Sequence, residues 1–202
     1  MKQMEQLNKS PFTIEDNVFV DCPTSYEGKV VVPDGITDIG DKALMFCNKV
    51  DEVKLPDSLE GIGMCAFHGC NFKEIKIPQK CQYIADAAFL SCISLREIDL
   101  PDGMLVLAEA LLCGCDELER VGIPDSVRII RETAFADCVK LKSLKLPANL
   151  EKLDAMAFAG CKSLKEITIP DSCRYLCYGV FKDCTSLERA IIGNGVSNEQ
   201  GG

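Results

Sequence analysis

Short runs of alternating apolar and polar residues recur along the chain and predict a series of short, similar strands. In one of them, Glu166-Ile167-Thr168-Ile169, apolar side chains occupy every second position and Pro170 follows directly. This alternation is typical of a strand with one buried face, and the proline ends the strand because it has no N–H to donate to a sheet. A second extended run follows within the unit, for example Val127-Arg128-Ile129-Ile130, so each unit is predicted to contribute two strands.

The units repeat with a fixed period. Successive prolines are separated by 23 residues except for one interval of 22, and a column of cysteines shows the same intervals in the same order. The two columns are Pro33, Pro56, Pro78, Pro101, Pro124, Pro147 and Pro170, and Cys47, Cys70, Cys92, Cys115, Cys138, Cys161 and Cys184. Because two independent columns share one period and its single deletion, the sequence predicts a repeat solenoid of about seven to eight stacked coils.

Each unit closes with a segment of the pattern Ala-Phe-x-x-Cys, such as Ala157 to Cys161. We expect this segment to form one helical turn on the convex side, where its bulk would curve the stack. No unit can bury its own apolar side. Stacked units can, because each apolar column then meets its own kind one coil away.

Together the columns follow the register L-x-x-I-x-I-P-x-x-L-x-x-I-G-x-x-A-F-x-x-C, most clearly at residues 62–70 and 157–170. This register resembles the bacterial surface-antigen type of leucine-rich repeat, called BspA-like, over about residues 30–196. The resemblance implies a leucine-rich-repeat fold, a right-handed β-α superhelix with a parallel β-sheet on its concave face. It also implies a surface or secreted protein that binds host or bacterial proteins.

Two features depart from the repeat pattern. The interval from Cys70 to Cys92 is one residue short, and Leu111-Leu112 stands where Ala-Phe is usual. The segment from Phe12 to Val20 resembles the capping hairpin of the same family, with its turn at Glu15-Asp16-Asn17. We therefore divide the chain into an N-terminal segment with a capping hairpin (1–25), the leucine-rich-repeat solenoid (26–196) and a flexible C-terminal tail (197–202).

The charge balance limits the classes of partner. The chain of 202 residues has 31 acidic and 22 basic residues and a net charge of -9, which disfavours nucleic acid and anionic membrane surfaces, because both require a basic face. No run reaches the about 20 apolar residues that span a bilayer, so we expect no membrane insertion. No signal peptide is visible. We expect a cytoplasmic protein, or a cell-surface or secreted one if a leader has been removed.

No residue pattern predicts catalysis, a cofactor or a metal site. The chain has 13 cysteines, and the seven of the column are expected to be buried, reduced thiols that donate weakly to neighbouring carbonyls. No C-x-x-C pair occurs, and zinc sites need paired ligand spacing. His68, the single histidine, is expected to be a solvated surface residue. The carboxylates of Glu97 and Asp99 lie on an open strand face without the pocket that acid–base chemistry requires, so we do not expect an enzyme.

The outward strand positions of the concave face are the candidate protein-binding site. The residues proposed for contact with a partner are Lys54, Lys76, Glu97, Asp99, Arg120, Ser143, Lys145, Glu166, Thr168 and Arg189. Glu97 with Asp99 is expected to form an acidic spot, and Arg120 with Gly122 a lower, more accessible patch beside it. Almost no exposed aromatic residues are expected, so the affinity for a protein ligand is predicted to be modest.

The last unit has no polar capping repeat, so residues 187–192 would leave a strand edge open. Either this strand pairs end to end with a second copy in a homodimer, or the tail covers it and the chain is a monomer. The leading functional hypothesis is a noncatalytic protein-binding module that acts in adhesion or in interactions with host or bacterial proteins. The alternative is a cytoplasmic structural or scaffold protein that associates with itself through the uncapped C-terminal end.

Overall fold

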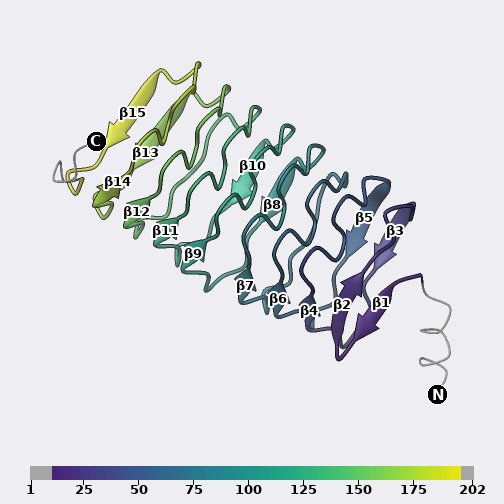
Figure 1. The fold of residues 1–202 in the computed structure, drawn as a ribbon. Helices are drawn as coiled ribbons and strands as arrows, with labels where there is room; N and C mark the ends of the chain where they lie inside the picture. Colours follow the sequence, from purple (N-terminus) through teal and green to yellow (C-terminus); the bar gives the residue numbers. More distant parts are fainter. Residues whose placement is uncertain (1–10, 197–202) are drawn as a thin grey trace.

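The computed structural model describes residues 11–196 as an elongated stack of coils, with the two ends of the chain at opposite ends of the stack (Figure 1). The first ten residues of the predicted N-terminal segment and the predicted tail 197–202 lie outside the described residues. Each sequence repeat forms one coil, and each coil passes through two sheets. Because equal residues of successive coils lie side by side, the columns in the sequence become rows in space.

The first sheet is built from the strands that precede the prolines. Its strands are β3 (Gly28–Val31), β5 (Val50–Lys54), β8 (Glu97–Asp99), β10 (Arg120–Gly122), β13 (Glu166–Ile169) and β15 (Arg189–Ile192). They pair in parallel as β3–β5, β8–β10 and β13–β15. In the two coils without an assigned strand, Glu74 and Ser143 make isolated bridges to Glu97 and Glu166. The first sheet is therefore divided into three parts.

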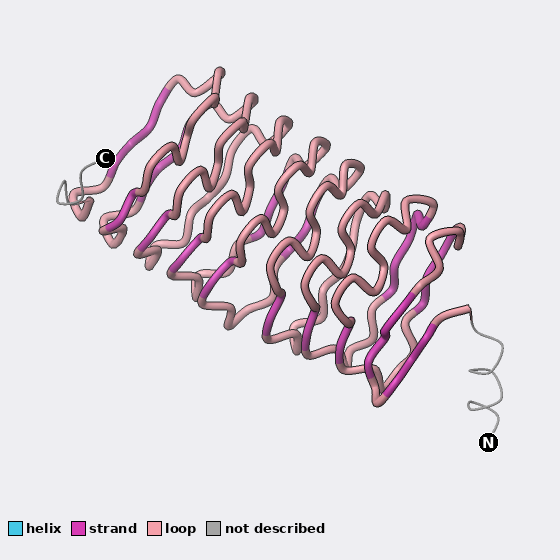
Figure 2. The backbone as a smooth tube through the Cα atoms, viewed as in Figure 1, coloured by secondary structure: helices cyan, strands magenta, loops and turns pink. Residues whose placement is uncertain are grey.

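The second sheet is built from the two-residue strands that follow the prolines. They are β4 (Asp38–Ile39), β6 (Gly61–Ile62), β7 (Tyr83–Ile84), β9 (Val106–Leu107), β11 (Ile129–Ile130), β12 (Lys152–Leu153) and β14 (Tyr175–Leu176). They form a row along one edge of the stack (Figure 2). Parallel pairing runs from β4 to β7 and again from β9 to β14, and it is interrupted between β7 and β9.

A hairpin covers the N-terminal end of the second sheet. Its strands β1 (Thr13–Glu15) and β2 (Val18–Asp21) are antiparallel, and β2 pairs in parallel with β4. Asp16 and Asn17 form the turn with φ of 46° and 64°. The ring of Phe12 packs on Phe19 and Tyr26, with ring centroids 5.3 and 4.8 Å away. The hairpin thus continues the apolar core instead of leaving its end bare.

The expected helical turns are absent: none of residues 11–196 is helical, so the prediction of a β-α superhelix was wrong in its helical part. Each closing segment instead contains two residues with left-handed φ, four positions apart. The two columns are Lys42, Cys65, Ala87, Ala110, Thr133, Met156 and Gly179, and Phe46, Gly69, Ser91, Gly114, Asp137, Gly160 and Asp183. A right-handed helix cannot continue through such reversals of φ.

The backbone of the closing segment is satisfied in a different way from a helix. Its N–H groups alternate between a local turn and the next coil: Cys47 N donates to Leu44 O at 3.1 Å, whereas Leu44 N donates to Ala66 O at 2.8 Å. Half of these N–H groups therefore bind neighbouring coils together, as a third row of hydrogen bonds beside the two sheets.

One apolar core runs through the stack, and no polar residue of the described part of the chain is fully buried in it. Phenylalanine rings stack along its length: the Phe135 and Phe158 centroids are 5.2 Å apart with an angle of 5° between the planes. Leu111 and Leu112 are both completely buried, so leucine fills the place of the usual Ala-Phe pair.

Candidate functional site

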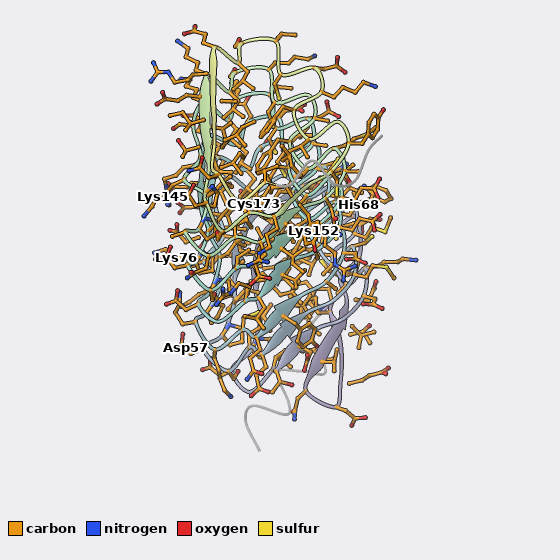
Figure 3. All side chains as sticks on the ribbon, turned by 90° about the vertical axis from the view of Figure 1, so that its left-hand side faces the viewer. Asp57, His68, Lys76, Lys145, Lys152 and Cys173 are labelled. Carbon is orange, nitrogen blue, oxygen red and sulfur yellow. The ribbon has the colours of Figure 1, made fainter. Side chains whose placement is uncertain are left out.

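The outer face of the first sheet carries all ten predicted contact residues, and every one of them is exposed: Lys54, Lys76, Glu97, Asp99, Arg120, Ser143, Lys145, Glu166, Thr168 and Arg189. Their apolar neighbours in the strands, such as Ile98 and Ile167, are buried. Lys76 and Lys145 project from the same side of the stack, while Cys173 lies inside and His68 toward the other side (Figure 3). The repeat therefore displays two columns of outward side chains on a regular scaffold.

The centre of this face is an ion-pair cluster around Arg120. Arg120 Nε donates to Glu97 Oε2 at 3.1 Å, while its Nη1 and Nη2 donate to the two carboxylate oxygens of Asp99 at 2.5 and 2.9 Å. The Arg120 guanidinium lowers the pKa of Asp99 through these hydrogen bonds. The expected acidic spot is thus partly neutralised, because one arginine from the next coil binds both carboxylates with its single positive charge.

The expected low patch at Arg120 and Gly122 is also absent. A Cβ atom on residue 122 would lie 2.2 Å from Asp99 Oδ1. The Asp99 carboxylate therefore occupies the space above Gly122, and the glycine serves to let this carboxylate reach Arg120.

Some of the other charged side chains on this face form ion pairs, and others do not. Lys29 pairs with Glu52 at 2.5 Å and Arg189 with Glu166 at 3.7 Å, both between neighbouring coils. Within residues 11–196, Lys54, Lys76 and Lys145 have no carboxylate within ion-pair distance. Exposed ion pairs of this kind contribute less than about 1 kcal/mol each to stability. They matter mainly because they determine which charged side chains are free to bind a partner protein.

Open depressions lie along this face, and one of them marks a place where the first sheet is divided. It has a volume of about 630 Å³ and lies between β5 and the segment 74–79, with Lys54 and Lys76 in its lining. A second, of about 550 Å³, lies between the segment 143–148 and β13, which the Ser143–Glu166 bridge joins, and has Lys145 and Thr168 in its lining. The first coincides with the short repeat, because the missing residue belongs to the turn between Cys70 and Phe72. Nothing in the structure explains the second.

The cysteine column lies between coils, with six members buried and Cys184 half-buried, and its expected hydrogen bonds to carbonyls are confirmed. Cys70 Sγ donates to Leu44 O at 3.1 Å and Cys138 Sγ to Leu112 O at 3.2 Å, and the other column members make the same contact. All 13 cysteines are free thiols. Burial raises the pKa of Cys138 and Cys161, so these thiols are poor nucleophiles at neutral pH.

His68 is not the solvated residue that the sequence suggested. Its ring packs on Phe46 with a centroid distance of 4.7 Å, and its Nδ1 is buried without a hydrogen-bond partner. Burial lowers the pKa of His68. Among the residues that the structure describes, no group of three or more His, Cys, Asp or Glu side chains is arranged to hold a metal ion.

The sequence interpretation missed a set of exposed aromatic residues on the second sheet and the turns beside it. Tyr83, Tyr175 and Tyr178 are 51%, 52% and 61% exposed, and Phe46 is also exposed. Leu105, directly before β9, is exposed as well. In the second strand of each coil, as in the first, apolar and polar positions alternate. The residue before the inward Ile or Leu therefore points outward, and this rule would have identified Tyr83 and Tyr175 as exposed.

None of the described residues forms a helix that is long and apolar enough to cross a membrane.

The family model described as "BspA type Leucine rich repeat region" matches residues 12–116 and 107–200 in six copies. No curated protein sequence matches the chain.

Solved structures of bacterial proteins share the fold. A leucine-rich repeat protein from Bacteroides ovatus is 32% identical with a TM-score of 0.70, covering 80% of this chain and 48% of its own. One from Eubacterium ventriosum is 22% identical with a TM-score of 0.72, covering 83% and 46%. The pneumococcal vaccine antigen PcpA is 21% identical with a TM-score of 0.53, covering 83% and 51%. The chain spans about half the length of these structures.

Proposed function

Since the chain belongs to the BspA-type leucine-rich repeat family, we propose that it is a noncatalytic module that binds another protein through the outer face of the first sheet. The observation that supports this best is the exposure of all ten outward residues on a scaffold of coils in register. Such a surface offers many side chains to an extended partner at once, and solenoids use their sheet faces in this way. The depressions on it are open to solvent, and catalysis would need an enclosed, water-poor site.

Lys54, Lys76 and Lys145 are the residues we propose to contribute most. Each lines a depression and has no ion-pair partner in the described part of the chain. A partner carboxylate can therefore bind these ammonium groups without first displacing an internal one. Arg120 is already bound to Glu97 and Asp99, so an incoming anion would have to compete for it.

The test is affinity capture with the 202-residue chain as bait. The bait is incubated with protein extracts of the source organism and of the cells or organisms that surround it. Captured proteins are compared between the native chain and a Lys54→Ala/Lys76→Ala/Lys145→Ala variant. A matched control replaces Lys42, Lys162 and Lys182, which are exposed away from the first sheet. We expect specific partners to be lost from the first variant and kept by the control. Equal retention by both variants would contradict binding through this face.

The alternative function is self-association through residues 187–192, as in a scaffold protein. Among the described residues, β15 pairs only with β13, and its Ile191 and Ile192 are 52% and 53% exposed. A free strand edge with apolar side chains favours pairing with another strand. Light scattering after size exclusion distinguishes a dimer from a monomer. A native mass of twice 22.1 kDa that falls to the mass of one chain in the Ile191→Lys/Ile192→Lys variant supports a dimer. A native mass of one chain contradicts it.

A further inference from the structure

Two thiols meet where the N-terminal hairpin joins the first coil. Cys22 directly follows β2, and Cys47 is the first member of the cysteine column. Cys47 Sγ lies 3.3 Å from the carbonyl oxygen of Cys22 and 3.8 Å from that of Pro23, and Cys22 Sγ lies 3.8 Å from the same Pro23 oxygen. Both sulfur atoms therefore gather around a single peptide carbonyl.

This arrangement differs from the rest of the cysteine column. From Cys70 onward, each thiol points at its own carbonyl in the preceding coil, as Cys92 does toward Phe67 O at 3.1 Å. Neighbouring thiols there are parallel and separated by one coil. Cys22 instead approaches the column from the hairpin, and the neighbouring Cys47 thiol, together with burial, raises the pKa of Cys22.

We propose that Cys22 and Cys47 are a disulfide-forming pair that covalently fastens the N-terminal hairpin to the first coil in an oxidising compartment. The backbone at Cys22 is already fixed beside the first coil, because Cys22 N donates to Ala43 O at 2.8 Å. This inference does not depend on the proposed binding function.

The chemistry is exchange with a small-molecule disulfide such as oxidised glutathione. The Cys47 thiolate attacks one sulfur of the reagent, forms a mixed disulfide and releases one glutathione thiolate. The Cys22 thiolate then attacks the Cys47 sulfur, forms the Cys22–Cys47 bond and releases the second glutathione. The two protein thiols are oxidised by two electrons, the reagent is reduced to two thiols, and the two thiol protons pass to the two glutathiones.

The hairpin is an end of the stack, and its described strands pair within the second sheet but not with the first. It is joined to β4 through the register pairs Val18↔Asp38 and Phe19↔Ile39, supported by the Phe12 ring, so a covalent link would add a second type of attachment. Cys22 is 3% exposed and Cys47 is fully buried. The reagent therefore reaches the pair when the hairpin opens or before it has docked, and the closed bond then disfavours reopening.

The experiment equilibrates the full chain in glutathione buffers from fully reduced to fully oxidised. Free thiols are alkylated, the protein is digested with trypsin, and linked peptides are identified by mass spectrometry. Cleavage after lysine places Cys22 and Cys47 in separate peptides, residues 10–29 and 43–49. We expect these two peptides to be linked at a more reducing potential than any other pair among the 13 cysteines.

Thermal unfolding provides the second readout. Oxidation should raise the unfolding midpoint of the native chain by roughly 5–10 °C, since the bond closes a loop of about 25 residues. Cys22→Ser should abolish the shift, and Cys113→Ser, a cysteine outside the column and remote from the hairpin, should preserve it. The proposal is overturned if other cysteines become linked while residues 10–29 and 43–49 stay separate. It is equally overturned if the link forms and the midpoint does not change.

Discussion

The ring of Tyr83 lies over Gly61, so closely that a Cβ atom on residue 61 would be 2.0 Å from Tyr83 Cζ. Gly61 and Tyr83 are register partners in β6 and β7, and the ring fills the space of the missing side chain. The Tyr83 hydroxyl then donates to Asp38 Oδ1 in β4. A single absent methyl group thus allows one tyrosine to connect three consecutive coils.

Replacing Gly61 with alanine should therefore destabilise the protein by about 1–3 kcal/mol, the usual cost of forcing a packed group aside. The backbone does not oppose the change, because Gly61 has no left-handed φ. Urea unfolding measures the cost. In a Tyr83→Ala background the same substitution should cost little, since the clashing ring is gone. A cost that persists in the double variant would show that the ring is not its source.

Tyr83 should also titrate above the usual pKa of a tyrosine. Donation to the Asp38 carboxylate, supported by partial burial, raises the pKa of Tyr83 from 10.0 to about 12. Because the folded pKa is the higher one, the stability that Tyr83 contributes is present below pH 10 and is lost as the pH rises toward 12. Ultraviolet absorbance should show a tyrosine ionisation near pH 12 in the native chain. In Asp38→Asn this ionisation should move down toward pH 10; an ionisation near pH 12 that survives the substitution would exclude Asp38 as its cause.

The strands and the core could be predicted because they follow from periodicity, which requires no knowledge of neighbouring side chains. The helical turn was a wrong prediction because the Ala-Phe-x-x-Cys spacing fits a helix as well as a chain of turns. One of the two left-handed columns did carry a signal, since Gly69, Gly114 and Asp137 are residue types that tolerate positive φ. The other column, with Ala87 and Met156, carried such a signal only at Gly179.

The outward position of the site residues followed from the same alternation, but their pairing did not. Arg120 binds both Glu97 and Asp99 because its side chain reaches back one coil, and the sequence does not fix which rotamer a long side chain adopts. Likewise, the packing of His68 against Phe46 joins variable positions of two coils. The repeat pattern describes only the positions that stay constant, so contacts between its variable positions were not predictable.

Substitution of Ala87 by glycine tests the left-handed turns directly, because its sign is opposite to that in a helix. Ala87 has a φ of 56°, which costs an L-residue about 1–2 kcal/mol. Relief of that strain exceeds the entropy that glycine adds to the unfolded chain, so Ala87→Gly should raise the free energy of unfolding by up to about 1 kcal/mol. In a helix the change would lower it by a similar amount. The adjacent Ala88→Gly is the control and should be destabilising by about 1 kcal/mol.

Cys138 should contribute to stability as a buried donor and not through its reactivity. Its side chain is fully buried and donates to Leu112 O at 3.2 Å. Cys138→Ala should lower the free energy of unfolding by about 1–2 kcal/mol, from a small cavity and an undersatisfied carbonyl. Cys113→Ala is the matched control, since this cysteine is partly exposed, and its cost should stay within about 0.5 kcal/mol. Equal costs at the two positions would mean that the inward thiols have no special role.

Finally, His68 should titrate below an ordinary histidine because Phe46 excludes water from one side of its ring. Burial lowers the pKa of His68 from 6.5, so the neutral form is favoured on folding. The stability that this contributes is present above pH 6.5 and is lost as the pH falls through the folded pKa.

As the single histidine, His68 gives one set of imidazole signals in an NMR titration, and its pKa should lie below 6.5 in the native chain. Phe46→Gly should move the pKa up toward 6.5, because it exposes the ring while keeping the left-handed φ of 62° easily accessible. His68→Gln should flatten the dependence of unfolding free energy on pH below pH 6.5. A native pKa at or above 6.5, or one that Phe46→Gly leaves unchanged, would mean that the Phe46 ring does not desolvate the imidazole.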